Sequence, residues 1–331
     1  MSNRSVPAAD AARPSERPRP RKRSVQVGGS RTCFWEYGDQ DATTTIVLVH
    51  GFRGDHHGLE PIAARLQEFR VIVPDLPGFG DSEPLEKTHD IDGYAAWLQG
   101  FLAVVAPAGR FVLLGHSFGS IVVSAMLAWQ ASDDAKDADA GQRPDLVVLV
   151  NPIGAPALKG PRAVFTRLAI FYYWLGAALP ERLGFALLRN ALIVRVMSEA
   201  MAKTKDRPLR RWIHDQHARY FSAFGSRGVV LEAFRASVSH DVSEYASSIG
   251  MPVLLIAADR DDITPLQAQH RLQTLFPDAR LHVVHGVGHL VHYEAPDDAA
   301  DSIRGFLAEH GAHAPGQHTG DGLDDAAGEP A

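Results

Sequence analysis

The feature that most constrains the fold is a serine between two glycines at a change of sequence pattern. Residues 110–116 form an apolar run typical of a buried strand, which runs into Gly115-x-Ser117-x-Gly119, and a helical pattern follows over residues 121–127. A serine at such a strand-to-helix turn adopts a strained backbone that exposes its Oγ atom. The glycines stand where a Cβ atom would collide as strand and helix approach. The pattern predicts an accessible nucleophile, Ser117; the alternative is an ordinary serine in a glycine-rich turn.

Composition limits the class of protein. The chain has 331 residues, 45% of them hydrophobic and 22% charged, which is typical of a globular protein with a sizeable core. Its net charge of -6 argues against a nucleic-acid binder, which needs a basic surface. The single cysteine, Cys33, excludes an internal disulfide framework and a thiolate zinc site, and it suits a reducing compartment. We therefore expect a cytoplasmic protein.

Both ends of the chain differ from the middle. Residues 1–23 are rich in Arg, Pro, Ala and Ser and end in Arg21-Lys22-Arg23, with no apolar segment after them, so they are not a recognisable secretory signal. We expect a disordered basic arm, solvated rather than in weak contact with anionic lipid or nucleic acid. Residues 311–331 show no periodicity and predict a disordered tail, whose histidines lack the spacing of a metal site.

Between these ends, strand and helix patterns alternate. Such an order with short connections predicts an open, mostly parallel sheet covered by helices on both faces, with its core in residues 24–154 and 249–310. The first two strands are short enough to form a hairpin around Gly28 and Gly29. The expected strands cover residues 25–27, 32–37, 45–49, 71–73, 110–116, 146–150, 253–257 and 281–284, and the expected helices cover 59–66, 91–105, 121–127 and 303–307.

A long interval, residues 155–248, separates two of these strands and has a helical pattern, with apolar positions recurring over 163–178 and 183–201. An insertion of this size predicts a lid over the carboxyl ends of the strands, where open sheets place their ligands. Its aromatic segment, residues 171–175, fits three interpretations: the core of the lid, the wall of an apolar pocket, or contact with a membrane surface. Membrane contact through the lid stays open, but we do not expect it, and the apolar stretch is short for a membrane span.

Four motifs follow one another in order: Val49-His50-Gly51-Phe52, residues 74–82, residues 115–119, and Gly286-x-Gly288-His289. Together they resemble the α/β-hydrolase superfamily, in the lidded branch that contains esterases, lipases and carbon–carbon bond hydrolases. The resemblance covers about residues 25–310. It implies the α/β-hydrolase fold and requires neither a metal nor an organic cofactor.

A serine hydroxyl is a poor nucleophile, so a base must take its proton and a third group must orient that base. In the superfamily the chain order is serine, acid, histidine. His289 follows the last strand in a Gly-x-Gly-His turn, at the same edge of the sheet as Ser117, and its surroundings resemble the family's catalytic-histidine loop. His285 and His292 are weaker alternatives, whereas His282 lies within the strand pattern and is expected to serve packing or the surface.

The acid is expected after the strand at residues 253–257. Family members place it four residues before a proline that opens the next helix, which implies Asp261, with Asp259 and Asp262 as reserves. Some relatives carry the acid after the strand that precedes the lid, but this chain has Asn151 there, which cannot ionise.

The same segment predicts how the following helix begins. Pro265 is expected to open the helix, with Thr264 as its N-cap and Gln267 completing a capping box.

The oxyanion hole of such an enzyme needs two backbone N–H donors from different loops. Phe118, at the start of the helix, is expected to supply one, and the resemblance implies Phe52 as the second. His50 is expected to hold the loop, although a substrate contact stays open, and residues 74–82 are expected to brace the site without chemistry.

These residues predict a serine hydrolase that cleaves a carboxylic ester of a small or medium apolar substrate through an acyl-enzyme. A carbon–carbon bond hydrolase of ring-cleavage products uses the same three groups and is the main alternative, and cofactor-free haloperoxidase activity also stays open. Serine at the elbow counts against epoxide hydrolases and haloalkane dehalogenases, which use a carboxylate nucleophile. An alternative from another class is a non-catalytic protein that binds an apolar ligand on the same scaffold.

Overall fold

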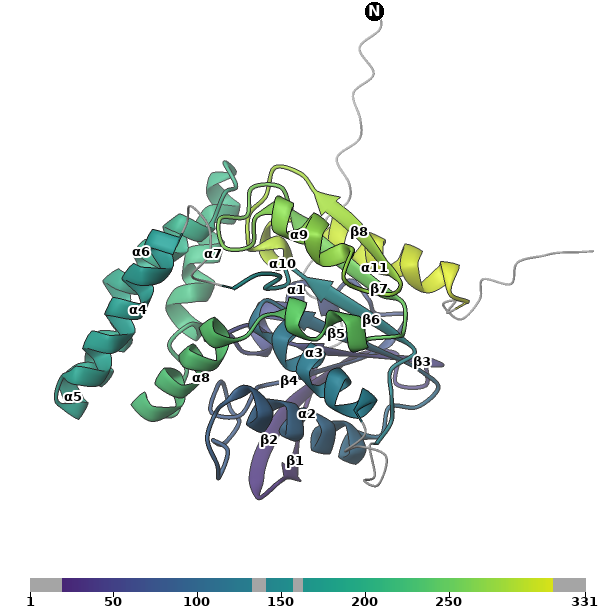
Figure 1. Ribbon diagram of the computed structural model, residues 1–331, viewed down its shortest axis with the longest axis horizontal. Coiled ribbons are helices and arrows are strands. Elements are labelled where there is room, and N and C mark those ends of the chain that lie inside the picture. Colours follow the sequence, from purple (N-terminus) through teal and green to yellow (C-terminus); the bar gives the residue numbers. More distant parts are fainter. Residues whose placement is uncertain (1–19, 133–140, 157–162, 312–331) are drawn as a thin grey trace, which may run out of the picture.

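The computed structural model describes residues 20–132, 141–156 and 163–311. Its centre is an eight-stranded sheet in the order β1-β2-β4-β3-β5-β6-β7-β8 (Figure 1). The pairs β1/β2 and β2/β4 are antiparallel and all others are parallel, which confirms the α/β fold and the predicted first hairpin. The strands are β1 (Arg21–Val27), β2 (Ser30–Gly38), β3 (Thr44–Val49), β4 (Arg70–Pro74), β5 (Arg110–His116), β6 (Leu146–Val150), β7 (Val253–Ala258) and β8 (Ala279–Val284).

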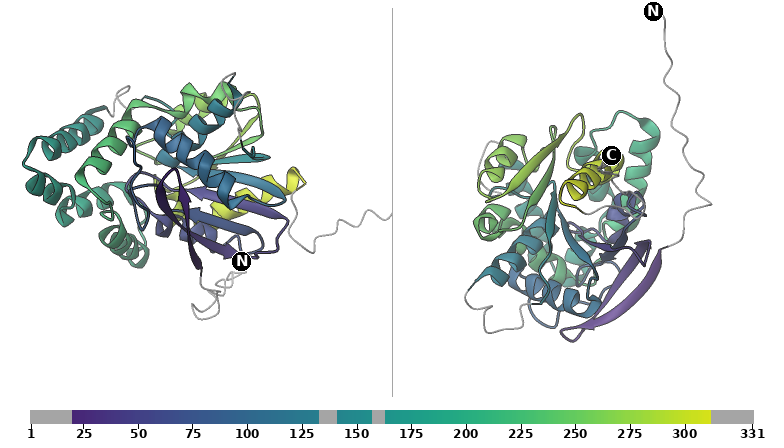
Figure 2. Two further views of the ribbon diagram at one scale, coloured as in Figure 1. Left: turned by 90° about the horizontal axis from the view of Figure 1, so that it is seen from below. Right: turned by 90° about the vertical axis from the view of Figure 1, so that its right-hand side faces the viewer.

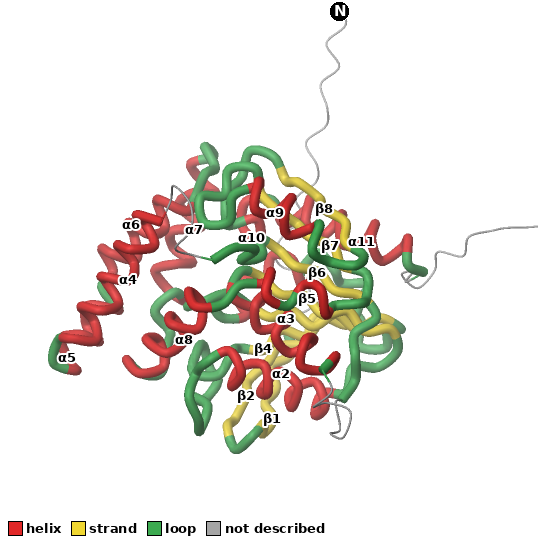
Figure 3. The backbone as a smooth tube through the Cα atoms, in the orientation of Figure 1, coloured by secondary structure: helices red, strands yellow, loops and turns green. Residues whose placement is uncertain are grey.

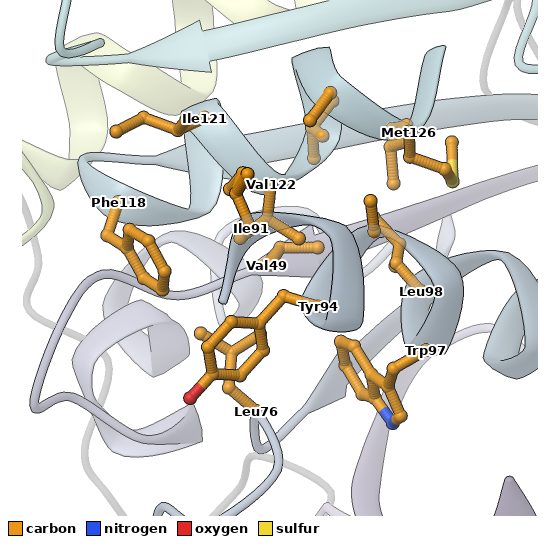
Figure 4. Packing of buried hydrophobic residues seen from close by; sticks show 14 of the residues in the cluster. Val49, Leu76, Ile91, Tyr94, Trp97, Leu98, Phe118, Ile121, Val122 and Met126 are labelled. Atoms are coloured by element: carbon orange, nitrogen blue, oxygen red, sulfur yellow. The ribbon is translucent and has the colours of Figure 1, made fainter. Parts of the chain in front are cut away.

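Helices cover both faces of this sheet (Figure 2). Helices α1 (His56–Ala63) and α11 (Pro296–Glu309) lie on one face, and α2 (Ile91–Val105), α3 (Phe118–Ala131) and α9 (Leu266–Gln273) lie on the other. Alternate residues of the central strands enter separate cores, which is why these strands are apolar throughout. In Figure 4 the ring of Tyr94 on α2 meets that of Phe118 edge to face at 5.4 Å, so the first residue of α3 is anchored in the core.

Five helices between β6 and β7 form what we call the helical insertion: α4 (Ala163–Ala178), α5 (Glu181–Leu188), α6 (Ala191–Met201), α7 (Arg207–Tyr220) and α8 (Arg227–Ser239). They gather at one end of the sheet (Figure 3). The helix expected at 163–178 is confirmed. The pattern at 183–201 is two helices, because the side chain of Asn190 accepts hydrogen bonds from the amides of Leu192 and Ile193 and starts a new helix. Among the described residues, no helix has the length and apolar character that crossing a membrane requires.

Several boundaries differ from the sequence-based expectation, and those of β1 and α1 are explained by side-chain contacts. Strand β1 begins at Arg21, so the last three residues of the expected disordered arm are in the sheet, where Lys22 pairs with Asp81 and Arg23 with Glu36. Residues 1–19 of the expected arm and residues 312–331 of the expected tail lie outside the described residues. Helix α1 starts at His56 rather than Leu59, because the Asp55 carboxylate accepts a hydrogen bond from the amide of His57 and caps the helix earlier.

The short helix α10 (Val291–Glu294) and the 3₁₀ turns η2 (Val242–Glu244) and η3 (Ala246–Ser248) complete the fold.

We predict that Gly119→Ala destabilises the fold, because the new Cβ would lie 2.3 Å from the Val49 carbonyl oxygen and 2.7 Å from that of His50. Neither backbone oxygen can move without shifting β3, so the expected loss is about 3 kcal/mol or more in the free energy of unfolding. Gly305→Ala is the matched control: it lies in α11 in open space and should change stability by about 1 kcal/mol at most, in the stabilising direction. Chemical denaturation of both variants measures this, and equal stabilities would contradict the prediction.

Candidate active site

Ser117 stands at a strained turn between β5 and α3. Its backbone has φ 52° and ψ -118°, a conformation that few residues other than glycine adopt. A Cβ atom on Gly115 would lie 2.6 Å from the Gly119 carbonyl oxygen, so strand and helix can close together only because both glycines lack side chains. The turn leaves Ser117 partly exposed while its neighbours are buried. The strained elbow expected from the sequence is therefore present.

Three loops bring a serine, a histidine and a carboxylate into one hydrogen-bonded chain. Nε2 of His289, in the loop after β8, lies 2.8 Å from Oγ of Ser117. Nδ1 of the same ring lies 2.7 Å from Oδ2 of Asp261, in the loop after β7. In this geometry the serine hydroxyl can pass its proton to the imidazole while the carboxylate fixes the orientation of the ring.

The carboxylate of Asp261 is buried but well supplied with donors. Its Oδ1 accepts from the amides of Ile263 and Thr264, and its Oδ2 accepts from the side chain of Asn151 at 2.9 Å. Burial opposes ionisation, but His289 and the Thr264 donors outweigh it and lower the pKa of Asp261 to about 2. The group thus remains an anion at any ordinary pH, and Asn151, at the position where some relatives carry the acid, supports the acid instead.

The predicted capping box at the start of α9 is wrong. The helix begins at Leu266, Pro265 occupies the cap position, and no side chain caps it. The Thr264 hydroxyl donates to Oδ2 of Asp261, so the Thr264 side chain is held at the site instead of accepting from an amide of the helix.

The alternative candidates lie elsewhere. Asp259 bonds to the exposed His285, and Asp262 forms an ion pair with Lys203. His292 is buried, with its ring centroid 4.2 Å from that of His116.

His282, expected to serve packing or the surface, pairs with Asp298 on α11. The structure therefore brings Asp261 and His289, rather than these alternatives, to Ser117.

Two buried histidines beside the site carry no charge at neutral pH. Burial lowers the pKa of His116 to about 3 and that of His292 well below its ordinary value. Neutral neighbours add no positive charge beside the His289 imidazole.

The loop after β3 lies directly against the elbow: a Cβ on Gly51 would be 3.1 Å from Cβ of Ser117. Among the residues that the structure describes, no protein acceptor is recorded for the amides of Phe52 and Phe118, the two expected oxyanion donors. His50 braces this loop, because its Nδ1 lies 2.8 Å from the Gly51 carbonyl oxygen and its Nε2 accepts from the Leu76 amide.

Aromatic rings surround the side chain of Phe52. Its centroid lies 5.8 Å from that of Tyr173, 6.0 Å from Phe234 and 6.4 Å from Phe118. Tyr173 and Phe234 stack on each other at 3.8 Å and come from the helical insertion. The insertion thus meets the core in an apolar cluster beside the elbow.

Two residues that were not predicted from the sequence tie the insertion to this site. Arg53, directly after Phe52, is 1% exposed and donates to backbone and side-chain oxygens of the insertion. The Glu294 carboxylate accepts from the amides of Gly288, Lys203 and Thr204, and so joins the His289 loop to the segment after α6. Glu294 lies in the histidine-loop motif and could have been singled out there; Arg53 carried no signal.

Asp55, His56 and His57 place potential metal-ligand atoms within 4.8 Å of one another. Their hydrogen bonds account for this arrangement: His56 contacts Asp75, and Asp55 caps α1 through the His57 amide. The cluster therefore belongs to the start of α1 rather than to the Ser117 site.

A family model described as "Alpha/beta hydrolase family" matches residues 46–302. The chain belongs to the alpha/beta hydrolase family. The match spans all three loops of the site and the whole helical insertion.

Relatives within the family differ in what they do. Lipase 1 of Psychrobacter immobilis is 24% identical over 85% of this chain and 81% of its own length. A 2-succinyl-6-hydroxy-2,4-cyclohexadiene-1-carboxylate synthase of Salmonella typhimurium is 25% identical over 81% of this chain and 95% of its own. The solved structure of a thermophilic esterase from Thermogutta terrifontis superposes with a TM-score of 0.67 at 21% identity, covering 87% of this chain and 98% of the esterase. Membership of the alpha/beta hydrolase family therefore leaves the substrate to be argued from the site.

We predict that Asp261→Asn lowers kcat about a thousandfold or more, because the amide cannot hold His289 in the required tautomer and orientation. Asp259→Asn is the matched control: it removes a neighbouring carboxylate that contacts His285 and Gly286 instead. Steady-state kinetics of both variants on one substrate checks the assignment, and an equal loss in the two would contradict it.

Proposed function

We propose that the protein hydrolyses a carboxylic ester of a small or medium apolar substrate through an acyl-enzyme. The observation that carries this proposal is the hydrogen-bonded chain from Ser117 through His289 to Asp261, which ends at a strained, partly exposed hydroxyl. A strained backbone at Ser117 and a buried carboxylate at Asp261 both cost folding free energy. Because the two occur together in one cluster of loops, they favour a catalytic role over a structural one.

In the proposed reaction, Oγ of Ser117 attacks the ester carbonyl carbon as its proton moves to Nε2 of His289. The amides of Phe52 and Phe118 hold the oxyanion that forms. His289 then gives the proton to the departing alcohol oxygen, leaving an acyl group on Ser117. A water molecule loses a proton to His289 and attacks the acyl carbon. His289 returns that proton to Oγ of Ser117 as the bond between Oγ and the acyl carbon breaks, which releases the carboxylic acid and restores the serine hydroxyl.

The apolar character of the substrate is supported by the rings around Phe52 and by Tyr173 and Phe234 of the insertion. We propose that the helical insertion acts as the lid of this site. The ester chemistry is supported by the similarity to a lipase and to an esterase fold, while the lengths of the acyl and alcohol parts depend on the insertion. The proposed steps use neither a metal nor an organic cofactor.

The test is intact-mass analysis after treatment with a fluorophosphonate, with Ser117→Ala as control. We expect one adduct on the wild-type protein and none on the variant, because a fluorophosphonate reacts readily only with an activated serine. Hydrolysis of p-nitrophenyl esters of increasing acyl length then defines the chain that fits. A folded wild-type protein that forms no adduct, or a Ser117→Ala variant that keeps the esterase activity, would contradict the acyl-enzyme and favour a binding protein.

A further inference from the structure

The outer side of α4 presents large apolar side chains to solvent. Leu168, Phe171 and Trp174 are 60%, 57% and 60% exposed. Their spacing of three residues places them on one side of the helix, and the Phe171 and Trp174 rings stack at 5.7 Å. The aromatic segment expected from the sequence is thus divided: Tyr173 is buried toward the site, and these two rings point away from it.

The next two helices continue this pattern. Leu183 on α5 is 59% exposed, and Leu192 and Val196, one turn apart on α6, are 73% and 61% exposed. Figures 1 and 2 show α4, α5 and α6 at the end of the molecule farthest from the sheet. We call these six exposed apolar residues the outer face: Leu168, Phe171, Trp174, Leu183, Leu192 and Val196. So many exposed apolar side chains on neighbouring helices are unusual for a surface that meets only water.

Basic side chains accompany the outer face. Arg167 precedes Leu168, Arg182 precedes Leu183, and Arg195 precedes Val196, all three arginines being exposed. Residues 163–220 contain ten Lys and Arg against four Asp and Glu, whereas the whole chain contains 33 against 39. Residues 163–201, which carry the outer face, contain four Lys and Arg against two Asp and Glu, and residues 202–220 contain six against two. The insertion is therefore a positive region on an acidic protein.

We propose that the outer face docks on the surface of an anionic lipid bilayer. Aromatic and leucine side chains would enter the boundary between headgroups and acyl chains while arginines contact lipid phosphates. A second copy of the chain is a poorer occupant, because pairing two such faces would bring like charges together. This docking is independent of the proposed ester chemistry, and its measurement does not depend on activity.

The test is co-sedimentation of the full chain with vesicles of phosphatidylglycerol and phosphatidylcholine, compared with phosphatidylcholine alone. We expect binding to the anionic vesicles that weakens with salt, and a drop of about tenfold or more in the double variant Phe171→Ser, Trp174→Ser. Trp129→Ser is the matched control, since Trp129 is an exposed tryptophan on α3, outside the insertion, and its loss should leave binding unchanged.

Three outcomes would overturn this proposal. The wild-type protein could fail to bind anionic vesicles; the double variant could bind as well as the wild type while circular dichroism shows both folded; or size-exclusion chromatography could show a wild-type dimer that the double variant dissociates. The last result would assign the outer face to a second copy.

A separate observation concerns Arg53, whose guanidinium is buried between the core and the insertion. It donates to the carbonyl oxygens of Leu188 at 2.8 Å and Phe221 at 3.0 Å, and to the Tyr173 hydroxyl at 3.3 Å. It also lies 4.7 Å from the centroid of the Phe221 ring. Among the described residues its recorded partners are neutral carbonyl oxygens, hydroxyl groups and aromatic rings, so this buried cation has no carboxylate to offset the high cost of its desolvation.

The backbone of Arg53 is constrained as well. Its φ of 61° lies in the left-handed region, and it directly follows Phe52, the proposed oxyanion donor. Side-chain contacts on the insertion and backbone strain in the oxyanion loop therefore meet in one residue. We infer that Arg53 is a positioning residue, which holds the Phe52 amide in place when the insertion is seated. This inference rests on the proposed function.

The test compares Arg53→Lys with Arg227→Lys. Arg227 also ties the insertion together through a carbonyl oxygen, that of Leu179, but lies far along the chain from the oxyanion loop. We expect Arg53→Lys to lower kcat and the rate of fluorophosphonate labelling at least tenfold with little change in KM, and Arg227→Lys to leave kcat unchanged. Wild-type labelling reports separately on the proposed function. Equal effects of the two variants, or an unchanged kcat in Arg53→Lys, would overturn the positioning role.

Discussion

The whole site depends on the close approach of two backbone segments at the Ser117 turn. The β5 strand, the start of α3 and the end of β3 come so near one another that a single methyl group on Gly119 would touch two carbonyl oxygens. This contact fixes where α3 begins, and so where the Phe118 amide points, and it holds the Gly51 loop against the serine. The packed core behind it includes Phe118 and Tyr94, so burial helps to hold the strained Ser117 backbone. Hydrogen bonds hold it as well: the Ser117 amide donates to the Val150 carbonyl oxygen, and the Ser117 carbonyl oxygen accepts from the amide and the hydroxyl of Ser120.

A second layer of organisation is electrostatic. The Asp261 carboxylate is the permanent anion of the site, and donors from Asn151, Ile263 and Thr264 keep it so despite its burial. The histidines next to it are either bonded to it or kept neutral by burial. The Asp261 carboxylate and the His289 ring are therefore the groups that act on the reacting hydroxyl. The arrangement suits proton transfer, because no positive charge on His116 or His292 opposes the protonation of His289.

How far the sequence could predict this site depended on how local each signal was. The elbow is readable because Gly115, Ser117 and Gly119 act on one another over five positions. Asp261 needed the family spacing, since Asp259 and Asp262 carry the same charge and only the three-dimensional path of the loop separates them. The prediction of a capping box failed because a local pattern cannot show that a carboxylate of the site, Asp261, holds the Thr264 side chain. The role of Arg53 could not be predicted from the sequence, because its partners lie 120 to 169 positions later in the chain.

The contacts of Arg53 also bear on how such a protein can change over time. Two of its partners are main-chain carbonyl oxygens, at Leu188 and Phe221, which every amino acid possesses. These two contacts constrain the path of the insertion's backbone and place no demand on the side chains at Leu188 and Phe221. Side chains at these positions of the insertion can therefore be substituted, and the molecules that the site admits can change with them. The contacts between Arg53 and the main chain remain, because a substitution does not remove a carbonyl oxygen.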